Sequence, residues 1–136
     1  MNYLILGSNS FAGASLVNYL LMRDHHVIGV SRSHEPNSVI LPYAKNSNLK
    51  NFQFYPYDIN HHFDDLKKLI TDKKPHYIID SAGQGMVAES WNAPEQWYQT
   101  NVVAKAKLHH FLRHLVDNPA NFRIIEQLRI LGQKLF

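Results

Sequence analysis

The segment from Gly7 to Gly13 has the spacing that most clearly suggests chemistry in this sequence. An apolar run, residues 3–6, stops at Gly7, and five residues of small or polar tendency lead to Gly13, where an amphipathic segment begins. Gly7 allows a sharp turn off a strand, Gly13 allows a helix to pack close to it, and free amides at the helix start favour a diphosphate. The dinucleotide pattern Gly-x-Gly-x-x-Gly has a further glycine where this chain has Ser10. The loop therefore predicts either a cofactor-binding loop or an ordinary strand–turn–helix.

A second candidate group is Ser31-Arg32-Ser33, which stands about twenty residues past the glycine loop. An NAD-specific site usually has Asp or Glu here, to hold the 2′-hydroxyl of the ribose. This chain has no acid at these positions, and a guanidinium between two hydroxyls suits a 2′-phosphate. The pattern favours NADP over NAD. The alternatives are a solvated loop arginine and an NAD site in which Arg32 stacks on the adenine.

Three further positions follow predicted strands or lie inside a predicted helix. Asp58 is placed either to accept a hydrogen bond from an adenine amino group or to serve as a plain turn residue. Gly83 and Gln84 follow an apolar run, where backbone passes close to a cofactor ribose or forms an ordinary loop. Asn101 lies on the apolar stripe of a helix, where an unpaired side chain costs about 1–3 kcal/mol. It is either a satisfied core residue or an anchor beside a site.

Metal and thiol chemistry find little support. His110 and His114 have the i, i+4 spacing of zinc ligands, but no third ligand is placed by spacing, so we expect a solvated face and no metal. The chain has no cysteine, which excludes disulfides, thiolate zinc sites and cysteine nucleophiles.

Alternating apolar runs and helical patterns place these groups in an α/β doubly wound sheet of the Rossmann type, truncated after about the fifth strand. We expect helices at residues 10–23, 63–71 and 94–116, and loops at residues 31–48 and 81–91. The expected strands are residues 3–6, 27–30, 52–57, 77–80 and a fifth beginning within 122–125. In such a sheet the ligand lies at the carboxyl ends of the strands. Four candidate loops would meet there: residues 7–13, 31–33, 58–59 and 81–85.

Composition limits the function classes. The chain of 136 residues suits one domain, 1–136, and its formal charge of +3 is too small and scattered to suggest nucleic acid. No apolar run is long enough to cross a bilayer, and the start lacks the basic region of a signal peptide, so we expect a cytoplasmic protein.

Four segments, in order, resemble the extended short-chain dehydrogenase/reductases of the NAD-dependent epimerase/dehydratase family. These are residues 6–13 (LGSNSFAG), 58–59 (DI), 78–84 (IIDSAGQ) and 90–103, the last around SWNAP and WYQTNVV. The resemblance covers about residues 2–118 and is nearest the nucleotide-sugar 4,6-dehydratases. It implies an NAD(P) cofactor and a nucleotide-sugar substrate. Together with the spacing, it predicts these cofactor-binding residues: Gly7, Ser8, Ser10, Phe11, Gly13, Ser31, Arg32, Ser33, Asp58, Ile59, Ala82, Gly83, Gln84 and Asn101.

The sequence departs from the family pattern in its catalytic residues. The family uses a Tyr-x-x-x-Lys pair, in which the lysine lowers the pKa of the tyrosine that takes a proton from the sugar. No tyrosine here has lysine four positions later, and the last tyrosine is Tyr98. Residues 126–136 form a basic amphipathic segment without the expected hydroxyl residues. The alternatives are a chain truncated or frame-shifted near Phe122 and a diverged short protein with a terminal helix.

Three functions follow as expectations. The first is the NAD(P)-binding part of a nucleotide-sugar epimerase or dehydratase, in which hydride leaves the sugar C4, without turnover by this chain alone. The second is a non-catalytic NADP-binding or partner-binding module, in which the apolar tail either covers an exposed sheet edge or meets another chain, as in a homo-oligomer. The third is a structural α/β domain that binds no cofactor.

Overall fold

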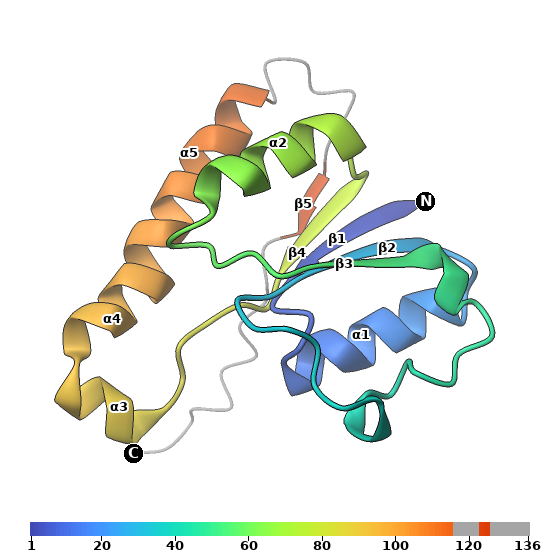
Figure 1. Cartoon of the computed structure of the whole chain (residues 1–136). Helices are drawn as coiled ribbons and strands as arrows, with labels where there is room; N and C mark the ends of the chain where they lie inside the picture. Colours follow the sequence, from blue (N-terminus) through green and yellow to red (C-terminus); the bar gives the residue numbers. More distant parts are fainter. Residues whose placement is uncertain (116–122, 126–136) are drawn as a thin grey trace.

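The computed structural model describes residues 1–115 and 123–125 and shows a twisted parallel sheet with helices on both faces (Figure 1). The strand order is β3-β2-β1-β4-β5, and every neighbouring pair is parallel. The chain therefore runs outward from β1 in one direction and returns to continue in the other, as the doubly wound prediction requires. The strands are β1 (Asn2–Leu6), β2 (His26–Val30), β3 (Phe52–Tyr55), β4 (Tyr77–Asp80) and β5 (Arg123–Ile125).

One face of the sheet is covered by α1 (Phe11–Leu21). Its helical spacing buries Val17 and Leu21 completely against Ile5 of β1 and Val27 of β2. The buried ring of Tyr43 closes this layer from the long loop after β2, and its hydroxyl donates to a carboxylate oxygen of Glu35, 2.6 Å away. Burial and this hydrogen bond raise the pKa of Tyr43 above its ordinary value. The loop is thereby anchored to the layer that supports the first helix.

The opposite face is covered by α2 (Phe63–Lys73) and α5 (Ala104–Leu115), which lie side by side in Figure 1. Leu66 and Ile70 of α2 are fully buried, and Leu108 and Leu112 of α5 are nearly so. All of them pack on the side chains of β1, β2 and β4 that point away from α1. The sheet thus separates two apolar layers.

Several predicted boundaries are wrong. The first helix ends at Leu21 rather than at Arg23, because residues 22–24 form a turn. The third strand ends at Tyr55 rather than at Tyr57, because Pro56 has no amide for the ladder and the Tyr57 amide turns back to the Tyr55 carbonyl. The helix α2 continues past Thr71 to Lys73 and ends at Lys74, whose φ of +44° is left-handed. The expected loop at 81–91 contains a short helix, α3 (Val87–Asn92).

The expected long helix from Pro94 is interrupted. It consists of α4 (Pro94–Tyr98), a π-helical turn (Gln99–Val103) and α5. Short 3₁₀ turns at Ser38–Ile40 and Leu49–Asn51 lie in and just after the long loop that follows β2. The predicted fifth strand is confirmed at Arg123–Ile125, and the rest of the tail, with Phe122, lies outside the described residues.

Candidate functional site

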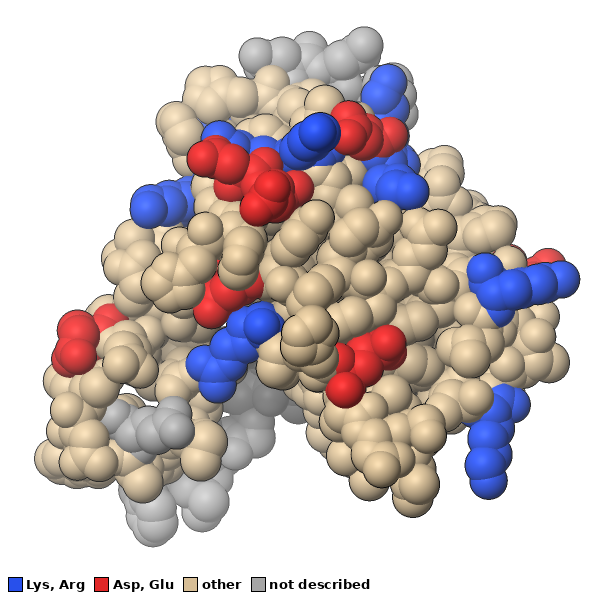
Figure 2. Space-filling model, in the orientation of Figure 1, with Lys and Arg blue, Asp and Glu red and all other residues tan. Residues whose placement is uncertain are grey.

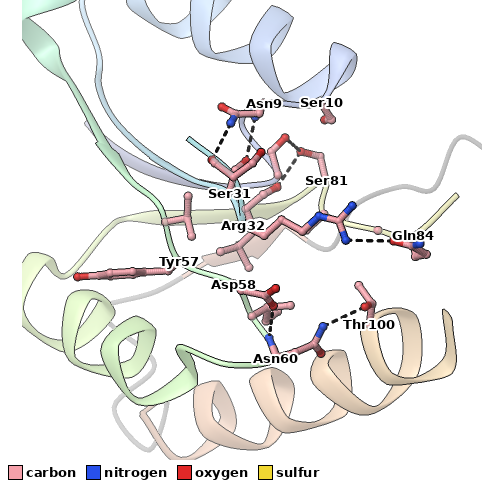
Figure 3. A pocket seen from close by; sticks show the side chains of 17 residues that line it. Asn9, Ser10, Ser31, Arg32, Tyr57, Asp58, Asn60, Ser81, Gln84 and Thr100 are labelled. Carbon is pink, nitrogen blue, oxygen red and sulfur yellow. Dashed lines mark hydrogen bonds between the residues drawn. The ribbon is translucent and has the colours of Figure 1, made fainter. Parts of the chain in front are cut away.

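A cavity of about 300 Å³ opens at the carboxyl edge of the sheet. It is bounded by the loop after β1, the ends of β2 and β3 with the segments that follow them, the segment after β4, and the π-helical turn. Figure 3 shows these segments converging around the side chain of Arg32. The lining residues are Leu6, Gly7, Asn9, Ser10, Val30, Ser31, Arg32, Ser33, Tyr57, Asp58, Ile59, Asn60, Ser81, Ala82, Gly83, Gln84 and Thr100. The four loops that the sequence predicted to meet do so.

The loop after β1 leaves two unpaired amides directly after Ser10, which lines the cavity. The Ser10 hydroxyl caps α1 by accepting from the Gly13 amide at 3.0 Å, and the Ser10 amide donates to the Gly7 carbonyl. Within the described part of the chain, the amides of Phe11 and Ala12 have no hydrogen-bond acceptor. Two donors at the start of an eleven-residue helix form an arrangement suited to an oxyanion.

Asn9 connects this loop to the end of β2. Its amide N–H donates to the hydroxyl oxygen of Ser31, and its side-chain Nδ2 donates to the carbonyl oxygens of Ser33 and His34, each at 3.0 Å. Arg32 lies between the two serines, is exposed, and extends across the cavity to Gln84 (Figure 3). Its Nη1 donates to Oε1 of Gln84 at 3.4 Å. One cation therefore spans the cavity between the ends of β2 and β4.

On the side below Arg32 in Figure 3, the segment after β3 supplies a carboxylate. One oxygen of Asp58 accepts from the Asn60 amide at 2.7 Å, which closes an Asx turn and fixes the carboxylate at the cavity. The side chain of Asn60 donates to the Thr100 hydroxyl at 3.0 Å and so ties this turn to the π-helical turn. Oδ1 of Asn60 is buried and accepts no hydrogen bond from the described residues.

The segment after β4 is held from behind by two side chains. Asn101 accepts from the Gln84 amide and donates to the Gln84 carbonyl, both at 2.9 Å. Lys105 donates to Asp80 at 2.5 Å and to the Ala82 carbonyl at 2.8 Å, with both charged side chains 18% exposed. These contacts hold the backbone of residues 81–84 against the cavity.

Ten of the fourteen predicted site residues line the cavity and four do not. Ser8 is fully buried, with a hydroxyl that has no partner among the described residues. Phe11 points its ring outward and is 92% exposed. Gly13 and Asn101 lie behind the wall, the first in contact with Gly7 and the second bound to Gln84. The side chains of these four residues do not border the cavity, so they affect its shape only through backbone atoms or through the residues they contact.

The sequence analysis did not identify Asn9, Tyr57, Asn60, Ser81 or Thr100 as lining residues. Asn9 and Ser81 lie inside motifs already singled out, so position alone gave a signal for them. Thr100 pairs with a residue forty positions away, and no local pattern encodes that contact.

The site offers binding groups of both signs rather than an acid–base pair. Arg32 and Asp58 are the charged side chains among the lining residues. On the face drawn in Figure 2, acidic and basic side chains are interspersed, and this face has no continuous basic stripe. Among the described residues there is no group of three potential metal ligands and no helix that is long and apolar enough to cross a membrane.

Comparisons with known proteins identify relatives of this chain. The family model of GDP-mannose 4,6-dehydratase matches residues 4–126. Protein CapI of Staphylococcus aureus is 30% identical over 116 residues, which are 84% of this chain and 34% of that protein. The chain thus spans about a third of the length of this relative.

Solved structures share the fold at low identity. A UDP-glucose-4-epimerase from Stenotrophomonas maltophila, solved with bound NAD, matches with a TM-score of 0.70 and 18% identity over 83% of this chain and 33% of its own. A dTDP-glucose 4,6-dehydratase from Bacillus anthracis, in complex with NAD, matches with a TM-score of 0.65 and 19% identity over 93% of this chain and 36% of its own.

Proposed function

The chain belongs to the GDP-mannose 4,6-dehydratase family, and from this premise we propose that its cavity binds a nicotinamide dinucleotide, with NADP preferred over NAD. In this proposal the chain is the cofactor-binding part of a nucleotide-sugar epimerase or dehydratase. The solved relatives from S. maltophila and B. anthracis hold NAD. The observation that carries the proposal for this chain is the pair of unpaired amides at Phe11 and Ala12, which directly follow Ser10 of the cavity lining.

The diphosphate is assigned to the start of α1. A phosphate oxygen there would accept from the Phe11 and Ala12 amides and lie at the positive end of the helix dipole. Gly7 and Gly13 let the start of α1 pack against the end of β1, because a Cβ on Gly13 would lie 2.2 Å from the Gly7 carbonyl oxygen. Ser10 stands where the dinucleotide pattern has a glycine. Its hydroxyl is turned toward the Gly13 amide, which it caps, and so leaves room for a phosphate oxygen.

The adenosine is assigned to the space between Arg32 and Asp58. Asp58 keeps a carboxylate oxygen for the amino group of the base, beside the apolar side chain of Ile59. Arg32, with the hydroxyls of Ser31 and Ser33 on either side, is suited to a 2′-phosphate on the ribose. The preference for NADP rests on this arginine and on the lack of an acid at the end of β2.

The remainder of the cofactor is assigned to the segment after β4. The backbone of Ala82, Gly83 and Gln84 would border the second ribose, held in place by Asn101 and Lys105. A nicotinamide bound there supplies hydride transfer to or from a sugar carbon. The residues of this chain bind and orient the cofactor, and no Tyr-x-x-x-Lys is present in the sequence to move the proton.

The lack of a Tyr-x-x-x-Lys pair in this sequence also supports a second candidate function, a module that binds NADP or a partner without catalysis. Both candidates predict dinucleotide binding and no turnover of GDP-mannose, dTDP-glucose or UDP-glucose by the purified chain. Detectable dehydratase or epimerase activity from these 136 residues would contradict that expectation.

The test is a calorimetric titration of the purified chain with NADPH and with NADH. We expect micromolar binding, tighter for NADPH. Arg32→Ala should weaken NADPH binding by about tenfold or more and affect NADH far less, because a charge-assisted hydrogen bond is worth about 1.5–3 kcal/mol.

Arg23→Ala is the matched control. Arg23 lies beyond the other end of α1, with its guanidinium 3.7 Å from the centre of the Tyr19 ring, and its removal should leave both affinities unchanged. A folded chain that binds neither dinucleotide refutes the proposed function. Tighter binding of NADH keeps the dinucleotide site and removes the assigned role of Arg32.

A further inference from the structure

Asn9 holds the two residues that flank Arg32. Its amide N–H is bound by the hydroxyl of Ser31, and its side chain donates both hydrogens, one to the Ser33 carbonyl and one to the His34 carbonyl. Three hydrogen bonds of 3.0 Å therefore join one residue of the loop after β1 to three residues at the end of β2. Within the part of the chain that the structure describes, Arg32 itself makes one long hydrogen bond, 3.4 Å, with Gln84.

The direction of the Arg32 side chain depends on this attachment. An exposed arginine has many rotamers, and its reach is set mainly by where its backbone starts. Fixing the residues before and after Arg32 fixes the Cα–Cβ direction, which points across the cavity toward Gln84 in Figure 3. Without the side-chain donors of Asn9, Ser31 would keep its bonds to the Asn9 amide and to the Tyr55 carbonyl. Ser33 and His34 would have no other hydrogen bond among the described residues.

We propose that Asn9 is a positioning residue that sets the discrimination between NADPH and NADH, by holding the β2-end segment so that Arg32 faces the 2′ position of the ribose. This inference rests on the proposed function and adds to it a residue that does not need to touch the 2′-phosphate. It also couples two parts of the site, because Asn9 belongs to the loop assigned to the diphosphate.

The chemistry of the side chain supports a role as a donor. Both hydrogens of the Asn9 amide group are used, whereas its Oδ1 is buried and lacks a partner among the described residues. A buried carbonyl oxygen that accepts no hydrogen bond is unfavourable. If Asn9 only filled space, an apolar side chain would stabilise the fold as well or better. The carbonyl oxygens of Ser33 and His34 accept from Nδ2 of Asn9, and an apolar side chain at this position could not donate to them.

The test is a double-mutant cycle read as the ratio of the NADPH and NADH dissociation constants. Asn9→Ala should weaken NADPH binding about tenfold and NADH binding by less than about threefold, the size expected when one charged contact is lost. In the Arg32→Ala background, Asn9→Ala should leave the ratio unchanged within about twofold, because no arginine remains to be aimed. If Asn9→Ala does not fold, Asn9→Ser takes its place, since its hydroxyl is too short to bridge both carbonyls.

Asn46→Ala is the matched control for loss of a loop tether. Asn46 ties the same long loop to the side chain of Asn18 on α1 at 2.8 Å, and it does not line the cavity. It should lower the melting temperature without changing the ratio. An unchanged ratio in Asn9→Ala, or an equal change with and without Arg32, overturns the inference while the proposed function stands. Failure of the unaltered folded chain to bind either dinucleotide refutes both.

Discussion

At the scale of single residues, two glycines bring the loop after β1 and the segment after β4 into contact. Gly7 has a φ of +78°, and a Cβ there would lie 2.6 Å from the Ala82 amide nitrogen. A Cβ on Gly13 would lie 2.2 Å from the Gly7 carbonyl oxygen and 2.9 Å from the Ser81 hydroxyl. The atoms in the way belong mostly to backbone, so neither site can relax by a rotamer change.

Gly13→Ala should therefore destabilise the fold by about 1–3 kcal/mol, the cost of overpacking a tight contact. Gly85→Ala is the matched control, because a Cβ on Gly85 would meet no atom within 4 Å and its φ is not left-handed. It should be neutral or slightly stabilising. Urea unfolding followed by circular dichroism measures both, and equal stabilities for the two variants would contradict the close approach inferred at Gly13.

The same scale shows what the sequence reveals of the site. The turn glycines and the Ser10 cap were predictable, because each depends on neighbours within a few residues. The place of Arg32 at the cavity was predictable because it directly follows the end of a parallel strand. Asn9 was not singled out, because its partners lie twenty-two to twenty-five residues away, and both acceptors of its side chain are backbone carbonyls. A carbonyl has no residue identity, so no sequence pattern marks it as a partner.

At the scale of elements, the site depends on how α5 joins the end of β4. The predicted single helix is interrupted by the π-helical turn, which presents Thr100 and Asn101 to the two neighbouring loops. Such turns often occur at functional sites. The sequence spacing gave no warning of this turn, because the prediction assumed one continuous helical repeat from Pro94. Below the turn, the pair of Lys105 and Asp80 joins the helix to the strand.

Asp80→Asn, Lys105→Met and the double variant form a thermodynamic cycle for this pair. The ion pair is largely shielded from water, and Lys105 also serves the Ala82 carbonyl, so each single change should cost about 2 kcal/mol. The coupling free energy should be about 1–2 kcal/mol. Dinucleotide affinity should fall in both single variants, because the backbone of residues 81–84 loses its support.

The exposed pair of Asp64 and Lys67 on α2 is the matched control. Lys67 lowers the pKa of Asp64 below its ordinary value through a hydrogen bond and its charge. The Asp64 side chain is 92% exposed, and water screens such a pair, so its cycle should show no measurable coupling. Equal coupling in the two cycles would show that the Lys105 contact adds nothing specific to the β4–α5 junction.

At the scale of the whole molecule, the order of elements determined what was predictable. Alternating strands and helices imply a parallel sheet with right-handed crossovers, and the order β3-β2-β1-β4-β5 follows that rule. The residues covering each face were predictable from helical spacing, as for Val17 and Leu21. Leu108 and Leu112 of α5, one helical turn apart, likewise face the sheet, while Phe111 is only partly buried.

We propose that the chain folds as one domain, with both apolar layers unfolding together. Ile5→Val removes a methylene from the layer under α1, and Ile70→Val removes one from the layer under α2, at two fully buried positions. Each should lower the free energy of unfolding by about 0.5–1.5 kcal/mol. Because the two side chains lie in separate clusters, the double variant should show the sum within about 0.5 kcal/mol.

A shared transition is what distinguishes one domain from two independent layers. Both layers use the same strands, since Leu4 and Leu6 face one side of β1 and Ile5 the other, so neither layer can separate while β1 remains paired. Far- and near-ultraviolet circular dichroism should give coincident unfolding curves for all variants. Val39→Ala, at a position 87% exposed, should leave the midpoint within experimental error. If Ile5→Val shifts one phase of unfolding and Ile70→Val shifts another, the two layers unfold separately. The strands that border the cavity would then not belong to one cooperative unit, which contradicts the one-domain proposal.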